Sequence, residues 1–407
     1  MFLCFEGFLM NTQTNYHIFD YIVIGKGLMG SAAARYLSQM TSNVAVIGPD
    51  EPEDFASHLG VFASHYDQGR ITRLISKDAI WSQLAMRAID QYADLQQRTG
   101  IHFHEPVGCL FVAQPTDPYF SQVLDTAERF NVDYVVYGSS AERATAHPHL
   151  LFPEQFASVY EPAPAGYINP RELIQAQMKV ARAQGTRLIS EVVTAVTPTP
   201  QGAIVTTESG QVYWTRNVLV AAGAFSNVHA LLPEKLPLRV KTETTILARI
   251  SASEVARLQG MPSIVYMVDA PTLDKIYMLP PIQYPDGNCY VKMGCNTAHD
   301  QWLISLQEMR DWMISGESDV AMADMQAALT AVLPELKVES FESRRCLVTY
   351  TTHGKPYVDQ VSEHVYVATG GNGSSAKSSD TIGWLAAHLM QMGDFPTGFS
   401  REDFQIL

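Results

Sequence analysis

The sequence contains few cysteines and no long apolar run. Its 407 residues include five cysteines, at positions 4, 109, 289, 295 and 346, and no CxxC pair. A scattered, odd-numbered set argues against a disulfide framework and a zinc site, and it is typical of a reducing compartment. Because no stretch of about 18 apolar residues occurs, we expect no membrane-spanning helix and interpret the chain as a cytoplasmic protein.

Positive charge is also scarce. Lys and Arg number 28 against 42 Asp and Glu, which gives a formal net charge of -14. Such an excess of negative charge repels phosphate backbones, so nucleic acid is not an expected partner. Hydrophobic residues make up 46% and charged residues 17% of the chain, a composition that buries a core and argues against disorder. At this length, two domains are expected.

The N-terminus does not resemble a secretory signal. The first ten residues, MFLCFEGFLM, carry Glu6, no Lys or Arg, and no small-residue cleavage site. We interpret residues 1–17 as an N-terminal extension. A start site wrongly assigned upstream of Met10 is the alternative.

A dinucleotide-binding unit is predicted near the N-terminus. The apolar run Asp20–Ile24 is followed by a glycine turn, a helix-like segment and a second apolar run, NVAVIG. Gly25, Gly27 and Gly30 form a GxGxxG motif in this strand–turn–helix context. The first glycine permits a tight turn, the second lets the backbone approach a pyrophosphate, and the third lets the helix lie close to the strand.

The acidic residue usual at the end of the second strand is missing, because Gly48 and Pro49 stand there. Asp50 and Glu51 follow, and either carboxylate can bind the ribose of the dinucleotide. Both can equally be solvated loop charges.

Two later segments repeat the strand-to-glycine pattern. NVLVAAGAF ends a predicted strand at Gly223, and HVYVATGGNG ends one at Gly370–Gly373. Between them, YPDGN predicts a hairpin and residues 301–333 predict helical structure before Pro334. Pieces of one nucleotide-binding domain therefore occur at the beginning, middle and end of the chain.

The last glycine turn favours a flavin over a nicotinamide. A helix is predicted to start near Ser374, and a helix N-terminus suits the flavin edge that becomes anionic on reduction. Lys377 lies in the first turn of this helix, where the helix dipole disfavours a cation. Its position suggests an anionic ligand nearby, and an exposed lysine is the alternative.

Four blocks of the chain carry a resemblance to a known family. They are SHYDQGRITR (residues 64–73), YVKMG around Lys292, CLVTYTTHGKPYVD from Cys346, and GGNGSSAK ending at Lys377. In this order they resemble the monomeric sarcosine oxidase and N-methyltryptophan oxidase family of flavoenzymes, within the D-amino acid oxidase-like superfamily. The resemblance covers nearly the whole chain and extends to the tail, DFPTGFSREDF.

The resemblance implies an α/β (α+β) fold with two domains. A discontinuous Rossmann-type FAD-binding domain is expected over residues 18–100, 156–235 and 341–407. A substrate domain, built on a mixed or antiparallel β-sheet with helices, is expected over residues 101–155 and 236–340.

The resemblance also implies chemical roles. Cys346 corresponds to the cysteine that bonds the flavin covalently, and Arg344 and Arg345 can lower its pKa if they face it. A buried, inert cysteine is the alternative. Lys292 corresponds to the lysine that activates oxygen above the flavin. Arg73 and Lys377 correspond to the pair that holds the substrate carboxylate, and Ser64, His65 and Arg70 correspond to residues that border the flavin ring and pyrophosphate. Together with the residues of the strand-and-glycine segments, the expected cofactor-binding set is Gly25, Gly27, Gly30, Asp50, Ser64, His65, Arg70, Val193, Gly223, Cys346, Gly370, Gly371, Asn372, Gly373 and Lys377.

The expected substrate pocket departs from the family pattern. Asn296 stands four residues after Lys292, where the family usually has a histidine, and asparagine does not titrate. Tyr277 is followed by Met and Leu, which reshape a pocket without identifying its occupant. The substrate is therefore not expected to be the simplest one of the family.

The implied activity is oxidation of a secondary, N-methyl or cyclic amino acid. Hydride passes to FAD, the imine is hydrolysed, and molecular oxygen is reduced to hydrogen peroxide. A flavin-dependent dehydrogenase that passes electrons to a quinone or carrier protein is the alternative, and a non-catalytic FAD-binding protein is a third reading. We expect a monomer or a weak homo-oligomer.

Overall fold

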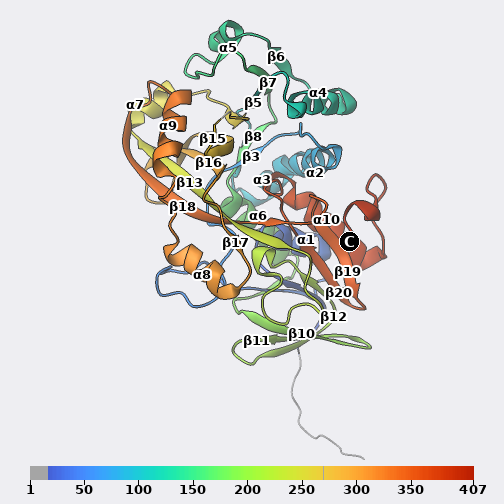
Figure 1. The fold of residues 1–407 in the computed structure, drawn as a ribbon. Coiled ribbons are helices and arrows are strands. Elements are labelled where there is room, and N and C mark those ends of the chain that lie inside the picture. Colours follow the sequence, from blue (N-terminus) through green and yellow to red (C-terminus); the bar gives the residue numbers. More distant parts are fainter. Residues whose placement is uncertain (1–16, 269) are drawn as a thin grey trace, which may run out of the picture.

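The computed structural model describes residues 17–268 and 270–407. Residues 1–16 of the expected N-terminal extension, with Cys4, lie outside the described residues. Two large sheets make up most of the fold, one of eight strands and one of nine (Figure 1). None of the helices within 17–268 and 270–407 has the length and apolar character needed to cross a bilayer.

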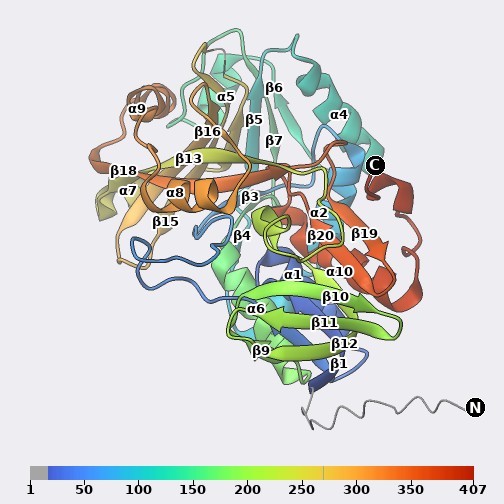
Figure 2. The same cartoon turned by 60° about the horizontal axis from the view of Figure 1, so that its bottom comes forward.

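The eight-stranded sheet contains the predicted dinucleotide unit. Strand β1 (His17–Ile24), helix α1 (Leu28–Leu37) and strand β2 (Val44–Ile47) follow in the predicted order. β1 pairs in parallel with β2 and with β12 (Val212–Val220), and every residue of β2 is buried, as is usual in parallel sheets. Its other strands, some of them visible from below in Figure 2, are β9 (Arg187–Ile189), β10 (Val193–Thr199), β11 (Gly202–Thr207), β19 (Tyr357–Ser362) and β20 (Val365–Thr369).

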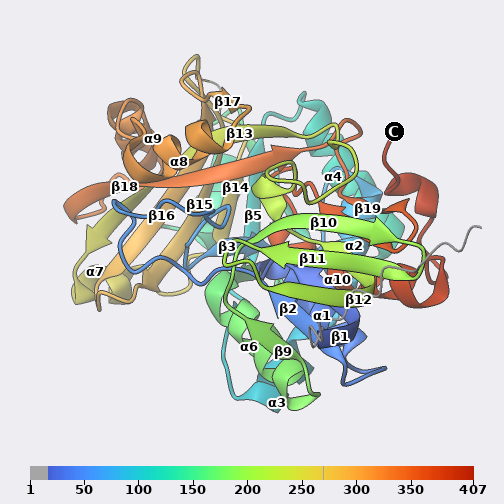
Figure 3. The same ribbon diagram turned by 90° about the horizontal axis from the view of Figure 1, so that it is seen from below.

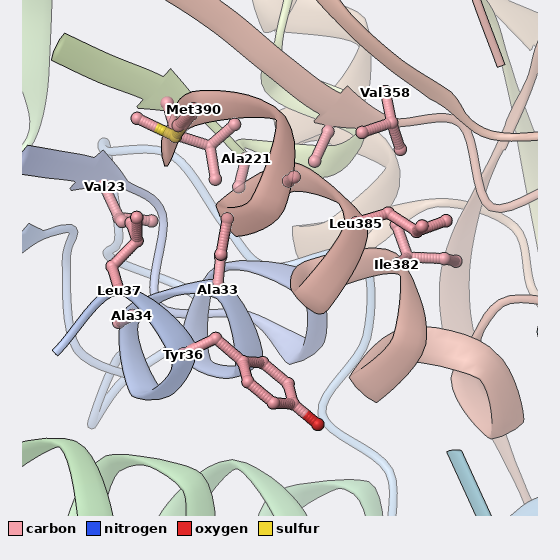
Figure 4. Packing of buried hydrophobic residues seen from close by; sticks show 14 of the residues in the cluster. Val23, Ala33, Ala34, Tyr36, Leu37, Ala221, Val358, Ile382, Leu385 and Met390 are labelled. Carbon is pink, nitrogen blue, oxygen red and sulfur yellow. The ribbon is translucent and has the colours of Figure 1, made fainter. Parts of the chain in front are cut away.

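Helices α1 and α10 (Ser379–Met392) pack closely on this sheet. Figure 4 shows Ala33 on α1 and Ile382, Leu385 and Met390 on α10 in one cluster of buried hydrophobic residues. A Cβ added to Gly383 would lie 2.6 Å from the Ala32 side chain, so the two helices approach through small residues. Helix α6 (Pro170–Ala183) also contacts α1. Together these contacts fix the glycine turn at the start of α1.

The nine-stranded sheet is mixed, as expected. Its strand order is β17-β13-β16-β15-β14-β5-β7-β6, with β18 on the other side of β13, and only β14 and β5 pair in parallel. The strands are β5 (Cys109–Ala113), β6 (Val135–Tyr137), β7 (Ala157–Glu161), β13 (Arg239–Ile250), β14 (Ser263–Tyr266), β15 (Leu273–Gln283), β16 (Cys289–Thr297), β17 (Trp302–Leu303) and β18 (Val338–Tyr350).

The predicted hairpin is confirmed, because β15 and β16 pair on either side of residues 284–288. The Tyr284 amide donates to the Asn288 carbonyl (2.9 Å), and Gly287 has a φ of 82°, which glycine adopts without strain. Helices lie within 301–333 as predicted; the helices of this half are α4 (Pro118–Phe130), α5 (Ser140–Ala146), α7 (Ala252–Arg257), α8 (Leu306–Ser315) and α9 (Met322–Val332).

The fold also contains a small three-stranded sheet, whose strands occur where the chain passes from one large sheet to the other. It consists of β3 (Arg70–Thr72), β8 (Gly166–Ile168) and β4 (His104–Glu105). Helices α2 (Ala79–Asp90) and α3 (Tyr92–Thr99) follow β3. Short 3-10 turns occur at η1 (Gly223–Phe225), η2 (Ala376–Ser378) and η3 (Arg401–Asp403).

The expected division into two domains stays a prediction. Strand pairing puts β7 and β18 in the nine-stranded sheet, although the expected boundaries assign most of both strands to the FAD-binding domain. Figure 3 shows β18 as a long strand that crosses the molecule beside β13. Because β18 extends from the nine-stranded sheet toward the eight-stranded sheet, residues at its C-terminal end lie near both sheets.

Candidate active site

The glycine turn has the shape of a phosphate-binding turn. A Cβ at Gly25, whose φ is 111°, would lie 2.4 Å from the Ala221 carbonyl oxygen, and one at Gly30 would lie 2.1 Å from the Gly25 oxygen. By contrast, a Cβ at Gly27 would meet nothing within 4 Å. No side chain caps the start of α1, so its first N–H groups face this open space. These residues therefore fit the diphosphate of FAD.

Asp50 lies beside the glycine turn. Its carboxylate accepts a hydrogen bond from Lys26, which stands between Gly25 and Gly27, and the hydrogen bond from Lys26 lowers the pKa of Asp50. The Asp50 side chain remains 71% exposed and accessible to a ligand. Glu51 instead pairs with Arg171. Of the two acids, Asp50 is thus the better placed for a ribose, and this role stays a proposal.

Four further residues of the expected cofactor set are Ser64, His65, Val193 and Gly223. Val193 is buried at the start of β10, and a Cβ at Gly223 would lie 3.1 Å from the Ser64 hydroxyl. The Nδ1 atom of His65 is buried and has no hydrogen-bond partner among the described residues. Burial and then Arg70 lower the pKa of His65 well below its usual value, so its ring is neutral. An unpaired ring nitrogen is available to a bound cofactor.

The turn after β20 is held by Asn372. Its Oδ1 accepts from the Thr351 amide (3.0 Å), and its Nδ2 donates to the Gly370 carbonyl (2.8 Å). Gly370 and Gly373 have φ values of 86° and 68°, and a Cβ at Gly371 would lie 2.5 Å from the Ser375 hydroxyl. The GGNG sequence therefore forms a compact turn before η2.

Lys292 lies inside the protein, fully buried on β16. Its ammonium group donates to the Asp67 carboxylate and to the Gly69 carbonyl (2.9 Å). Arg70 donates to the same Asp67 carboxylate. A buried ammonium needs such partners, because removing an unpaired charge from water is costly. Asp67 was assigned no role by the sequence, although it stands within the SHYDQGRITR block.

Cys346 lies against the same group of charges. The Nη2 atom of Arg70 is 3.4 Å from its sulfur. Burial raises the pKa of the Cys346 thiol, whereas Arg70 lowers it. The condition under which the adjacent arginines would lower this pKa, that they face Cys346, is not met. Arg344 pairs with Glu342 (3.0 Å), and Arg345 points from the opposite face of the strand and donates to the Gly316 carbonyl (2.8 Å).

Arg73 and Lys377 are brought together from distant segments, because β3 packs against η2. Arg73 donates to the Tyr119 hydroxyl (2.8 Å). Lys377 is buried, its Nζ donates to the Ser374 carbonyl (3.0 Å), and it lies 5.4 Å from the centre of the Trp81 ring. Helix α10 begins at Ser379 rather than near Ser374, so Lys377 lies in the 3-10 turn before it.

A third charged group, Glu161, lies with these two cations. Its carboxylate accepts from the amides of Leu74 (2.6 Å) and Ile75 (3.1 Å), directly after Arg73. Burial raises the pKa of Glu161 to about 7, and Arg73 and Lys377 act in the opposite direction. Burial and then Arg73 lower the pKa of Lys377 to about 7. A cavity of about 10 Å³, room for roughly one water, is lined by Arg73, Ile75, Cys109, Phe111, Val123, Val159 and Glu161.

Tyr277 and Asn296 occupy the sheet face that carries Lys292. The Lys292 ammonium lies 5.0 Å from the centre of the Tyr277 ring, and this ring covers Gly294, where a Cβ would lie 2.5 Å from it. Asn296 accepts from the Lys241 ammonium (2.7 Å) and donates to Asp274 (3.2 Å). Lys241 was missed by the sequence because its partners are distant in the chain.

Comparison with known proteins identifies the family of the chain. Residues 20–389 match the family described as "DAO: FAD dependent oxidoreductase". The chain belongs to this family. It is an FAD-dependent oxidoreductase, and the expected resemblance and fold class are confirmed. Monomeric sarcosine oxidase of Bacillus sp. (strain B-0618) is 23% identical over 386 residues, which cover 92% of this chain and 93% of that protein.

Solved structures show the same fold. NikD, described as an unusual amino acid oxidase essential for nikkomycin biosynthesis, superposes with a TM-score of 0.75 at 17% identity, covering 96% of this chain and 97% of its own. L-proline dehydrogenase from P. horikoshii superposes with a TM-score of 0.71 at 17% identity, covering 95% and 96%. The fold is therefore shared by proteins named as an oxidase and as a dehydrogenase.

Proposed function

We propose that this FAD-dependent oxidoreductase is an oxidase of secondary, N-methyl or cyclic amino acids. The observation that carries the proposal is that Arg73 and Lys377 converge where β3 packs against η2. The same segment, directly before β3, holds Lys292 through the Gly69 carbonyl. A planar guanidinium and a point-charge ammonium together suit one carboxylate. We refer to Arg73 and Lys377 as the carboxylate clamp. The family relationship to monomeric sarcosine oxidase supports an amine as the group oxidised.

The chain's own residues bind and orient the substrate. The carboxylate clamp fixes the carboxylate, and Tyr277 and Asn296 on the sheet face border the remainder of the substrate. Bound FAD, held by the glycine turns with Cys346 as its covalent attachment point, supplies the hydride acceptor. The imine product is then hydrolysed by water. Positioning of the carbon to be oxidised is the main task left to the protein.

Lys292 supports oxygen as the electron acceptor. Transfer of an electron to oxygen creates negative charge, and a fixed buried cation stabilises it. The Lys292 ammonium is fully buried and held at two oxygens, so it needs little rearrangement. Hydrogen peroxide is the expected product. The rival acceptor, a quinone or carrier protein, would require no cation at this position.

Anaerobic reduction of the flavin tests the substrate class. N-methyl, cyclic and primary amino acids, each with a matched amine that lacks the carboxylate, are mixed with enzyme, and flavin bleaching is followed. Removing one charged hydrogen-bond donor costs about 1.5–3 kcal/mol, so Arg73→Met and Lys377→Met should each weaken amino-acid binding about 10- to 100-fold. The matched amines should be nearly unaffected.

Lys77→Met is the control, because Lys77 is an exposed cation 5.2 Å from the same Tyr119 ring that Arg73 contacts. It should bind amino acids as the wild type does. If both clamp variants bind carboxylates as tightly as the wild type, the substrate class is wrong. Slow reoxidation of the reduced enzyme in air would instead favour the dehydrogenase.

A further inference from the structure

The Asp67 carboxylate accepts hydrogen bonds from three side chains in the protein interior, and Lys292 is one of them. Its carboxylate is only 6% exposed. One oxygen accepts from both the Lys292 ammonium and Arg70, and the other accepts from the Tyr284 hydroxyl (2.9 Å). These donors come from β16, β3 and the hairpin turn after β15, so the carboxylate fixes three segments relative to one another.

Two cations meet at this single buried anion. Lys292 and Arg70 repel each other, and neither has another carboxylate within salt-bridge distance among residues 17–268 and 270–407. The ammonium charge can persist in this interior only with a partner, because burial disfavours the charged form of a lysine. The charged or titratable groups facing Lys292 from the elements around it are His65, Asp67, Arg70, Glu243, Tyr277, Tyr284 and Cys346.

We propose that Asp67 is a positioning residue that keeps Lys292 charged and fixes its ammonium group for the reaction with oxygen. The role of the Lys292 charge in the reaction with oxygen rests on the proposed function. The electrostatic coupling between Asp67 and Lys292 does not depend on it. Asp67 acts through Lys292 rather than on the substrate. The second fixed contact, to the Gly69 carbonyl, then sets the direction of the ammonium.

The electrostatics of the group support this role. Burial and then Arg70 lower the pKa of Lys292 to about 8, and Asp67 is the largest influence in the opposite direction. Although burial raises the pKa of Asp67, Lys292 and Arg70 hold it well below its usual range. Asp67 is therefore ionised and Lys292 largely protonated at pH 7. Loss of the carboxylate would leave burial and Arg70 to deprotonate the lysine.

The titration of Lys292 tests the coupling directly. In holoenzyme labelled with ε-13C-lysine, the Lys292 resonance is the one absent from Lys292→Gln. Its midpoint should lie near 8 in the wild type. An adjacent opposite charge shifts a pKa by about 1–3 units, so Asp67→Asn should lower the midpoint by that amount. Tyr284→Phe removes one hydrogen bond to Asp67 without changing its charge, and it should leave the midpoint in place.

Flavin reoxidation by oxygen provides the functional readout. A midpoint lowered by about 2 units from 8 reduces the protonated fraction at pH 7 about tenfold. Asp67→Asn should therefore slow reoxidation about tenfold at pH 7, with recovery as the pH falls toward 5. Reduction of the flavin by substrate should change much less, so the two half-reactions separate in stopped-flow measurements.

An unchanged or raised midpoint in Asp67→Asn, or faster reoxidation, would overturn the inference. If Asp67→Asn does not fold, the titration of Lys292 in the wild-type protein still tests the inference. A wild-type Lys292 midpoint below about 7 would overturn the inference. Reoxidation of Lys292→Gln at the wild-type rate would contradict the proposed oxidase instead. The titration would then still decide whether Asp67 controls the charge of Lys292.

Discussion

The guanidinium of Arg70 lies 3.4 Å from the sulfur of Cys346, although β3 and β18 belong to different sheets. Covalent attachment of a flavin requires a thiolate, and a nearby cation stabilises that form. Arg70 is itself held by Asp67, so its position does not depend on the cofactor.

We predict that the flavin is covalently bound through Cys346. After denaturation of the purified protein in acid, the yellow colour should remain with the polypeptide. Cys346→Ser should release all of its flavin under the same conditions, because a hydroxyl is a much weaker nucleophile at neutral pH. Complete release from the wild type would contradict the prediction.

Arg70 rather than its sequence neighbours should control this attachment. Arg70→Met should slow covalent incorporation when apoprotein is mixed with FAD, because burial then raises the thiol pKa without opposition from the guanidinium. Arg344→Met is the matched control, since Arg344 pairs with Glu342 and its side chain is 53% exposed. Incorporation is measured as the fraction of flavin that resists acid. Equal slowing in the two variants would show that proximity to Cys346 is not the cause.

Carboxylate binding should weaken as the pH rises through about 7. Burial and then Arg73 lower the pKa of Lys377 to about 7, so the ammonium charge is present below this pH and is lost above it. Glu161, whose pKa burial raises to about 7, becomes negative over the same range and repels the ligand. Flavin spectral titration with a small thioether carboxylate between pH 6 and about 9 checks this. A dissociation constant that does not change over this range would be the contrary result.

The Glu161→Gln variant separates the contributions of Lys377 and Glu161 to the pH dependence of carboxylate binding. Because the amide carries no charge, the repulsion above pH 7 should disappear and leave only the titration of Lys377. The pH dependence should therefore become shallower but persist. In Lys377→Met, by contrast, only the Glu161 contribution should remain.

Asp380 should be essential for stability. It is fully buried and accepts from Arg35 (2.7 Å), Tyr36 (2.6 Å) and Gln177 (2.7 Å), and so joins α1, α6 and α10. Breaking a buried ion pair on one side costs about 3–5 kcal/mol, so Asp380→Ala should lower the free energy of unfolding by that amount. Denaturant unfolding measures it.

The control for Asp380 is an exposed ion pair. Asp94 and Arg98 pair at 3.3 Å on the surface of α3, with side chains 60% and 41% exposed. Asp94→Ala should change the free energy of unfolding by no more than about 0.5 kcal/mol. Similar losses in the two variants would mean that burial of Asp380 is not the source of its effect.

Local patterns in the sequence predicted the parts of the fold that depend on neighbouring residues. The GxGxxG turn and the YPDGN hairpin follow from backbone requirements within a few residues, and both occur as predicted. The partners of the charged side chains could not be predicted from local sequence. The proximity of Arg70 to Cys346 depends on how β3 lies against β18, which no local pattern specifies.

The two buried carboxylates of the candidate site, Asp67 and Glu161, were missed for the same reason. No local pattern marks either carboxylate, and their roles depend on cations from other parts of the chain, Lys292 for Asp67 and Arg73 and Lys377 for Glu161. Arg345 lies on the strand face opposite Cys346, because consecutive side chains on a strand alternate between faces. Arg344, two residues from Cys346, pairs with Glu342 instead.

The arrangement of the glycine turns has a consequence for synthesis on the ribosome. The first turn, at Gly25, is translated before the others, but β1 pairs with β12, and β12 in turn pairs with β20, which is translated much later together with η2. Domains generally fold as units once their sequence is available. A chain terminated before residue 346 would lack both Cys346 and Lys377. The complete site therefore cannot assemble before residue 377 has been translated, and a chain terminated before that point cannot retain the cofactor in its native setting.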